Sequence, residues 1–90
     1  MRLISEDGRL DVPYEKVSLE MIKKDDPDGL NTYEVWAIEN GGGTSRWLMA
    51  CYFSEEMALG AMQQARFASQ RSAHWFEFRT RGIWRDPDGR

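Results

Sequence analysis

A short apolar run that passes directly into a helix-forming segment constrains the fold of this chain most strongly. Residues 47–53 are all apolar or aromatic, and a run of this length is typical of a strand that is buried on both faces. Ser54 then stands where its hydroxyl can cap a helix, and Glu55 and Glu56 lie where the helix dipole favours negative charge. Because neither Gly nor Pro separates the two segments, the helix must fold back at once over a sheet.

The segment of residues 55–70 has the spacing of an amphipathic helix. Apolar side chains recur at steps of three and four residues and form one narrow stripe, which consists of Ala58, Ala61, Met62, Ala65 and Ala68. Because most of these side chains are methyl groups, we expect the helix to approach the sheet closely. Aromatic side chains of the sheet would fill the remaining space, and Gly60 would mark a close backbone contact.

The N-terminal segment predicts a β-hairpin. Asp7 and Gly8 form a strong signal for a two-residue turn in which both residues take positive φ. Such a turn would place Leu3 opposite Val12 and would bring their side chains to the same face. Pro13 has no amide hydrogen for a ladder, so this strand would end there or run along an edge.

Three further strands are expected from alternating, aromatic and β-branched residues. They cover residues 17–22, residues 32–39 and, after the helix, residues 74–80. The strand of residues 32–39 carries apolar groups on both faces, which indicates an interior position in the sheet. The glycine-rich loop of residues 40–45 is short enough to join two neighbouring strands as an antiparallel hairpin.

Together these elements predict an α+β fold, an antiparallel β meander of five to six strands with one helix, at about residues 55–70, packed on one face. We expect residues 1–80 to form a single domain and residues 81–90 to form a polar C-terminal tail. One helix cannot cover both faces of a twisted sheet. Either the sheet curls around the helix, or its other face meets a partner, which could be a second copy of the chain.

Charge and cysteine content narrow the class of protein. The net charge of −3 does not indicate a general binder of polyanions. Cys51 is the one cysteine, so no intrachain disulfide can form, as is typical of a cytoplasmic protein. The N-terminus lacks the pattern of a signal peptide, and no apolar stretch is long enough to cross a membrane.

The residues that usually carry catalysis do not form a recognisable set. His74 has no nucleophile that can be placed beside it, so we interpret it as a strand residue rather than a general base. Cys51 lies inside the apolar run, which favours packing in the core over a reactive thiol. The acidic residues of the 25–28 loop depart from the spacing of a calcium-binding loop. We therefore expect no enzyme, no cofactor and no metal site.

Arginine and aromatic residues interleave near the C-terminus. Arg and Trp are enriched among residues that dominate protein–protein binding energy, and the same combination can stack on single-stranded nucleic acid. A third interpretation is a solvated sheet edge. We take the partner-binding residues to be Trp84, Arg81, Arg85 and Arg79.

Two segments resemble those of a group of small uncharacterised proteins from Gram-positive bacteria and their phages. Residues 1–15 combine the Asp-Gly hairpin with an Asp-Val-Pro-Tyr-Glu segment, and residues 53–58 are similar to that group's helix start. The resemblance implies a cytoplasmic protein of a mobile element, and it supplies no catalytic residues. The C-terminus, rich in Arg and Trp, departs from the group.

We therefore expect a non-enzymatic small interaction protein, encoded by a phage or mobile element, that binds and modulates a host or defence protein. An anti-CRISPR-like inhibitor is one form of this function. The alternative is a single-stranded nucleic-acid-binding module that uses the C-terminal Arg/Trp segment. A small hydrolase or ligand-sequestering protein is a third class, and it would need a deep pocket.

Overall fold

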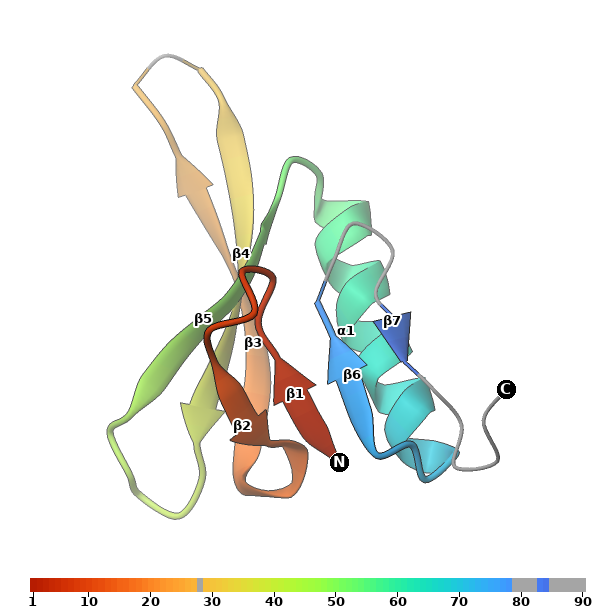
Figure 1. The fold of residues 1–90 in the computed structure, drawn as a ribbon. Helices are drawn as coiled ribbons and strands as arrows, with labels where there is room; N and C mark the ends of the chain where they lie inside the picture. The colour runs from red at the N-terminus through yellow and green to blue at the C-terminus, as the bar shows by residue number, and fades with distance from the viewer. Residues whose placement is uncertain (28, 79–82, 85–90) are drawn as a thin grey trace.

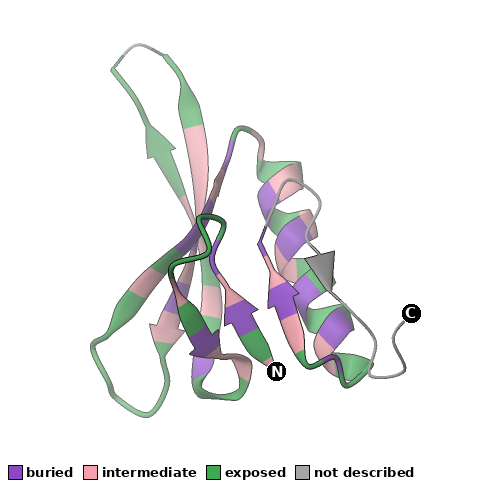
Figure 2. Ribbon diagram, in the orientation of Figure 1, coloured by how far each residue is buried: buried purple, intermediate pink, exposed green. Residues whose placement is uncertain are grey.

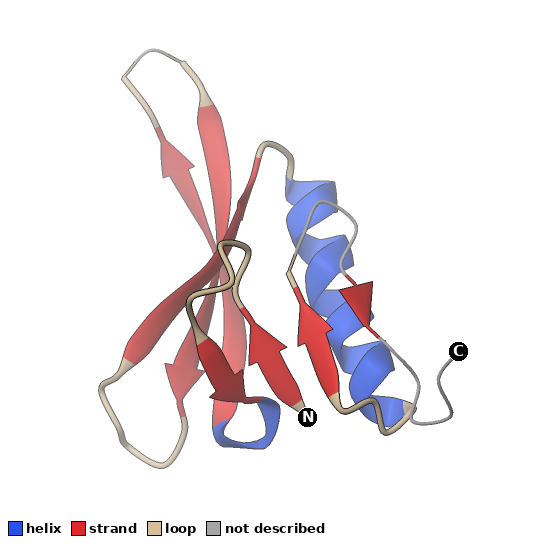
Figure 3. Cartoon of the chain, in the orientation of Figure 1, coloured by secondary structure: helices blue, strands red, loops and turns tan. Residues whose placement is uncertain are grey.

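The structure is a computed structural model, and it describes residues 1–27, 29–78 and 83–84 of the chain. It confirms an α+β fold with a β meander (Figures 1 and 3). In chain order the elements are β1 (Arg2–Ile4), β2 (Asp11–Pro13), the 3-10 turn η1 (Tyr14–Lys16), β3 (Val17–Asp25), β4 (Asn31–Glu39), β5 (Arg46–Tyr52), α1 (Glu55–Gln70), β6 (Trp75–Glu77) and β7 (Ile83–Trp84).

The strands form two sheets rather than one. The meander β3–β4–β5 is antiparallel throughout, whereas the second sheet has the order β2–β1–β6–β7. Its central pair, β1 and β6, is parallel, with Leu3 beside Phe76. A parallel pair needs a long connection between its strands, and here most of the chain, including the meander and α1, forms that connection. Periodicity within each strand carries no information about such a distant partner.

The β1–β2 hairpin has the predicted register, but its turn differs. Leu3 pairs with Val12 as expected. Gly8 takes a φ of 76°, whereas Asp7 does not have a positive φ, so the expected two-residue turn is wrong. The Gly8 N–H instead donates to the Ser5 carbonyl at 2.9 Å. The four residues 6–9 close the hairpin, and the register is preserved because this loop takes one more residue from each strand than a two-residue turn would.

Ser5 holds this loop together from a buried position. Its hydroxyl donates to Asp7 Oδ1 at 2.6 Å and accepts from the Leu10 N–H at 3.0 Å. The Arg9 N–H donates to the same Asp7 oxygen at 3.0 Å. The hydrogen bond from Ser5, followed by the one from Arg9, lowers the pKa of Asp7, because both favour the charged carboxylate.

A β-bulge interrupts the pairing of β4 and β5. Val35 pairs with Ala50 and Trp36 pairs with Leu48, so Met49 is an extra residue without a partner on β4. Because of the bulge, the side chains of both Met49 and Ala50 are buried in the core. The prediction that this strand is buried on both faces is wrong, since β5 is an edge strand and Leu48 is 39% exposed.

The bulge also joins the two sheets. The Glu6 N–H, at the tip of the β1–β2 hairpin, donates to the Met49 carbonyl at 2.7 Å. An extra residue in a bulge leaves its backbone groups outside the regular ladder, so this carbonyl is available to the hairpin. The contact fixes the hairpin tip against the edge of β5.

Helix α1 has the predicted bounds, cap and buried stripe. The Met57 N–H donates to the Ser54 hydroxyl at 3.1 Å, which confirms the N-cap. The stripe lies against strands of both sheets (Figure 2), and its fully buried members are Ala58, Ala61, Ala65 and Ala68. A side chain at Gly60 would meet open space, so the expected close contact there is wrong.

Phe76 and Phe78 supply the bulk that the small helix residues lack. Both are fully buried, and their rings meet edge to face with centroids 5.0 Å apart and an interplanar angle of 82°. Such a geometry is favoured by the charge distribution of aromatic rings. Both side chains therefore belong to the core that α1 covers.

The helix ends in a Schellman motif with an unusual residue at its left-handed position. Ser72 takes a φ of 58°, where glycine is the usual residue. The Ala73 N–H donates to the Ala68 carbonyl and the Ser72 N–H to the Ser69 carbonyl, each at 3.0 Å. Both hydrogen bonds of the motif therefore form, although Ser72 must adopt a left-handed backbone conformation that is unfavourable for serine.

We predict that Ser72→Gly stabilises the protein by about 1 kcal/mol, because glycine adopts the left-handed conformation without a steric penalty. A gain of this size would raise the melting temperature by about 4–8 °C in a domain of this length. Gln70→Gly, inside the last helical turn, is the matched control and should lower it. A lower melting temperature for Ser72→Gly would contradict the motif.

We also predict that Ala65→Arg costs about 3–5 kcal/mol, because it buries an uncompensated charge between the helix and the sheets. That is a large share of the stability of a small domain. Gln64→Arg, on the exposed side of the same turn, should leave the urea midpoint nearly unchanged. Equal midpoints for the two variants would show that the buried face is wrongly assigned.

Candidate functional site

One face of the β3–β4–β5 sheet is turned away from α1, and we call it the outer face. Side chains alternate between the two sides of a strand, and the inward set, including Leu19, Val35 and Ala37, packs in the core. By this alternation and the register, the outer face consists of Ser18, Glu20, Ile22, Lys24, Thr32, Glu34, Trp36, Ile38, Arg46, Leu48 and Cys51.

The centre of the outer face is apolar. Trp36 stands directly opposite Leu48 on β5, and Ile38 follows it two residues along β4. Ile22 lies diagonally across from Trp36 on β3, within the reach of neighbouring side chains on one sheet face. Trp36, Ile38 and Ile22 are half-buried and Leu48 is exposed. Together they form a contiguous apolar surface with no covering element among the described residues.

Trp36 is fixed in place by two charged neighbours. Its indole Nε1 donates to Glu34 Oε1 at 3.1 Å, and the Arg46 guanidinium lies 5.5 Å from the centroid of its ring. A hydrogen bond and a cation–π contact hold the ring on the sheet before any partner arrives. A side chain that is already ordered loses less entropy on binding, which favours its use as an anchor.

The charges around this apolar centre have both signs. Glu20 stands opposite Trp36 on β3, and Glu34 lies on the same strand as Trp36. Arg46 stands opposite Ile38 on β5. An apolar centre with a ring of mixed charge has the composition of a protein-binding surface.

A small hollow adjoins the outer face where the hairpin tip meets β5. Its volume is about 100 Å³, and it is lined by Glu6, Asp7, Leu48, Met49, Ala50 and Cys51. Nearby, burial and then the negative charge of Glu6 raise the pKa of Tyr52 to about 12, because both disfavour the phenolate. The hollow is too small for an organic ligand, since pockets for such ligands have volumes of about 300–1,000 Å³.

Most of the residues that we expected to bind a partner fall outside the part of the chain that the structure describes. Arg79, Arg81 and Arg85 lie outside the described residues. The backbone of Trp84 belongs to β7, where it pairs with Phe76, and its side chain lies outside the description. In the sequence, apolar groups on both faces of residues 32–39 were the signal for the outer face. They indicated an interior strand, and β4 is indeed the central strand of its sheet.

The two residues considered for catalysis belong to different elements of the fold. Cys51 is half-buried on the outer face opposite Glu34, so its expected place in the core is wrong. This follows from the bulge, which turns Met49 and Ala50 inward in its place. His74 is exposed, and its carbonyl accepts from the Arg2 N–H.

The part of the chain that the structure describes contains neither a cluster of metal ligands nor a membrane-spanning helix. No group of three or more His, Cys, Asp or Glu side chains could hold a metal ion within residues 1–27, 29–78 and 83–84. In the same part of the chain, α1 is too short and too polar to span a bilayer. Comparisons with protein-family models, curated proteins and solved structures give no match.

The raised pKa of Tyr52 predicts a specific dependence of stability on pH. The folded state favours the protonated phenol, so the associated stability is complete below about pH 10, the ordinary tyrosine value, and is lost as pH rises toward 12. In urea titrations, the free energy of unfolding should fall more steeply between pH 10 and 12 for the native protein than for Tyr52→Phe. Parallel curves for the two proteins would contradict this cause.

Proposed function

We propose that this chain is a non-enzymatic small interaction protein that binds a host or defence protein through the outer face. The supporting observation is the apolar centre around Trp36, which stays open on a sheet whose other side is filled by the core. Open apolar surfaces on small domains mark interaction sites. Trp and Arg are both enriched among the residues that dominate the binding energy of protein interfaces.

The cellular setting of this proposal comes from the sequence. The resemblance of residues 1–15 to proteins of Gram-positive bacteria and their phages favours a cytoplasmic protein encoded by a phage or mobile element. In that setting the partner is a protein of the host or of its defence systems. An anti-CRISPR-like inhibitor is one form, in which the outer face covers a functional surface of the partner.

A single-stranded nucleic-acid-binding module is the second candidate, and it uses the C-terminal segment instead. The observation in its favour is the composition of that segment, in which Trp84 lies among several arginines. The outer face does not support it, because Glu20 and Glu34 beside Trp36 would repel phosphate groups. Fluorescence anisotropy with single-stranded DNA and RNA across salt concentrations discriminates, since phosphate contacts weaken steeply with salt.

We predict that Trp36→Ala weakens binding to a partner captured from host extract and then purified. A central anchor contributes about 2 kcal/mol or more, which corresponds to a loss of about 30-fold in affinity. Leu59→Ala removes an exposed apolar side chain from α1, on another part of the surface, and should change affinity less than about threefold. Isothermal titration calorimetry measures both constants, and thermal melting shows that both variants fold.

Two results would contradict the assignment of the interface to the outer face. One is an unchanged affinity for folded Trp36→Ala. The other is a stronger effect of Leu59→Ala than of Trp36→Ala, which would move the interface to α1. Turnover of a substrate that a single substitution abolishes would instead make the protein an enzyme.

A further inference from the structure

Strand β3 is an edge strand whose free side faces a groove. It pairs with β4 alone in the order β3–β4–β5. The Asn40 N–H donates to the Lys16 carbonyl at 3.0 Å, and the Glu39 N–H donates to the Ser45 carbonyl on the other side of β4. Backbone groups alternate between the two sides of an antiparallel strand. Because Lys16 bonds to the residue that follows β4, the N–H and C=O groups of Ser18 also point toward β4, and those of Leu19 point away from it.

The same alternation directs the backbone groups of Leu19 and Met21 to the free edge. The Val17 N–H, at the start of the strand, is bonded to the Tyr14 carbonyl. Beyond it, no backbone hydrogen bond from another described segment reaches this side of β3. An edge of this kind is a template for one more strand.

The groove lies between β3 and α1 and has a volume of about 370 Å³. Tyr14, Val17 and Leu19 line it from the strand side, and Met62 lines it from the helix. These residues belong to the core or pack against it, so the groove offers an apolar wall beside unpaired backbone groups. Proteins that bind extended peptides by strand addition combine these two features: the backbone hydrogen bonds supply affinity, and the contacts with side chains supply specificity.

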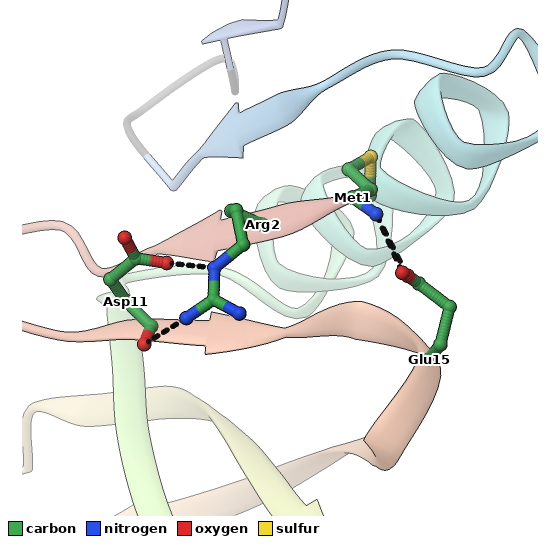
Figure 4. Close-up of polar contacts among 4 residues, drawn as sticks. All are labelled: Met1, Arg2, Asp11 and Glu15. Carbon is green, nitrogen blue, oxygen red and sulfur yellow. Dashed lines mark hydrogen bonds and ion pairs between the residues drawn. The ribbon is translucent and has the colours of Figure 1, made fainter.

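Arg66 supplies a charge at the mouth of this groove. It is exposed, and no ion pair joins it to an acid of the described residues. Glu15 is the one acid among the lining residues, and its Oε1 lies 2.6 Å from the N-terminal ammonium (Figure 4). Arg66 can therefore take a carboxylate from a ligand, in the paired geometry that guanidinium groups favour.

The spacing of Met62 and Arg66 matches that of a strand. Four residues of a helix rise about 6 Å, and side chains two residues apart on one face of a strand are separated by about 6.7 Å. An extended peptide can therefore place an acidic side chain on Arg66 and an apolar side chain against Met62, two residues away. We propose that the groove between β3 and α1 binds such a peptide segment of a partner protein as an additional strand on β3.

This inference goes beyond the proposed function, because the residues that line the groove and those of the outer face have Ser18 alone in common. Selection of a displayed library of random seven-residue peptides against the full chain tests it directly. Enriched peptides should carry Asp or Glu two positions from an apolar residue, and folded Arg66→Glu should bind them at least about tenfold more weakly. Trp36→Ala should bind these peptides with unchanged affinity. A negative result for the groove would therefore leave the assignment of the outer face intact, and the reverse also holds.

The position of the bound peptide is read from amide chemical shifts. An enriched peptide should shift the resonances of Leu19, Met21 and Met62. N-methylation of the peptide amides that face β3 should abolish binding, and methylation of the alternate amides should not. The proposal is overturned by three results: no enrichment, enriched peptides that bind Arg66→Glu as tightly as the native protein, or shifts confined to the outer face.

Discussion

The close approach of α1 to both sheets is the contact on which the rest of the structure depends. Four buried alanines face the strands, and with methyl side chains the helix backbone can lie near β4 and β6 together. Phe76 and Phe78 fill the remaining volume from the second sheet. Packing at this density tolerates little change in volume, so the helix position sets where both sheets can lie.

A domain with one helix cannot cover every surface of two sheets. Because α1 occupies the inner side of the meander, the outer face and the free edge of β3 are left open. The outer face and the free edge of β3 differ in structure. On the outer face, charged neighbours hold the ring of Trp36 in place. Beside β3, a groove separates the edge from the helix. These open surfaces are what the protein offers to partners.

The sequence predicts those parts of the fold that local patterns determine. The helix bounds, the Ser54 cap and the pairing of Leu3 with Val12 follow from spacing and turn residues. The bulge at Met49 and the parallel pairing of β1 with β6 depend on contacts between distant segments, which leave no period in either strand. The sequence pattern around Trp36 likewise indicated an interior strand and gave no sign that one face of that strand stays open.

Hydroxyl-radical footprinting of the protein, alone and with its captured partner, tests the role of the outer face most directly. Radicals oxidise side chains that water can reach, so a binding surface becomes protected when the partner covers it. We predict that oxidation of Trp36 and Leu48 falls strongly in the complex, while oxidation of Phe67 on α1 stays the same. Unchanged oxidation of Trp36 and Leu48 in a formed complex would contradict the account.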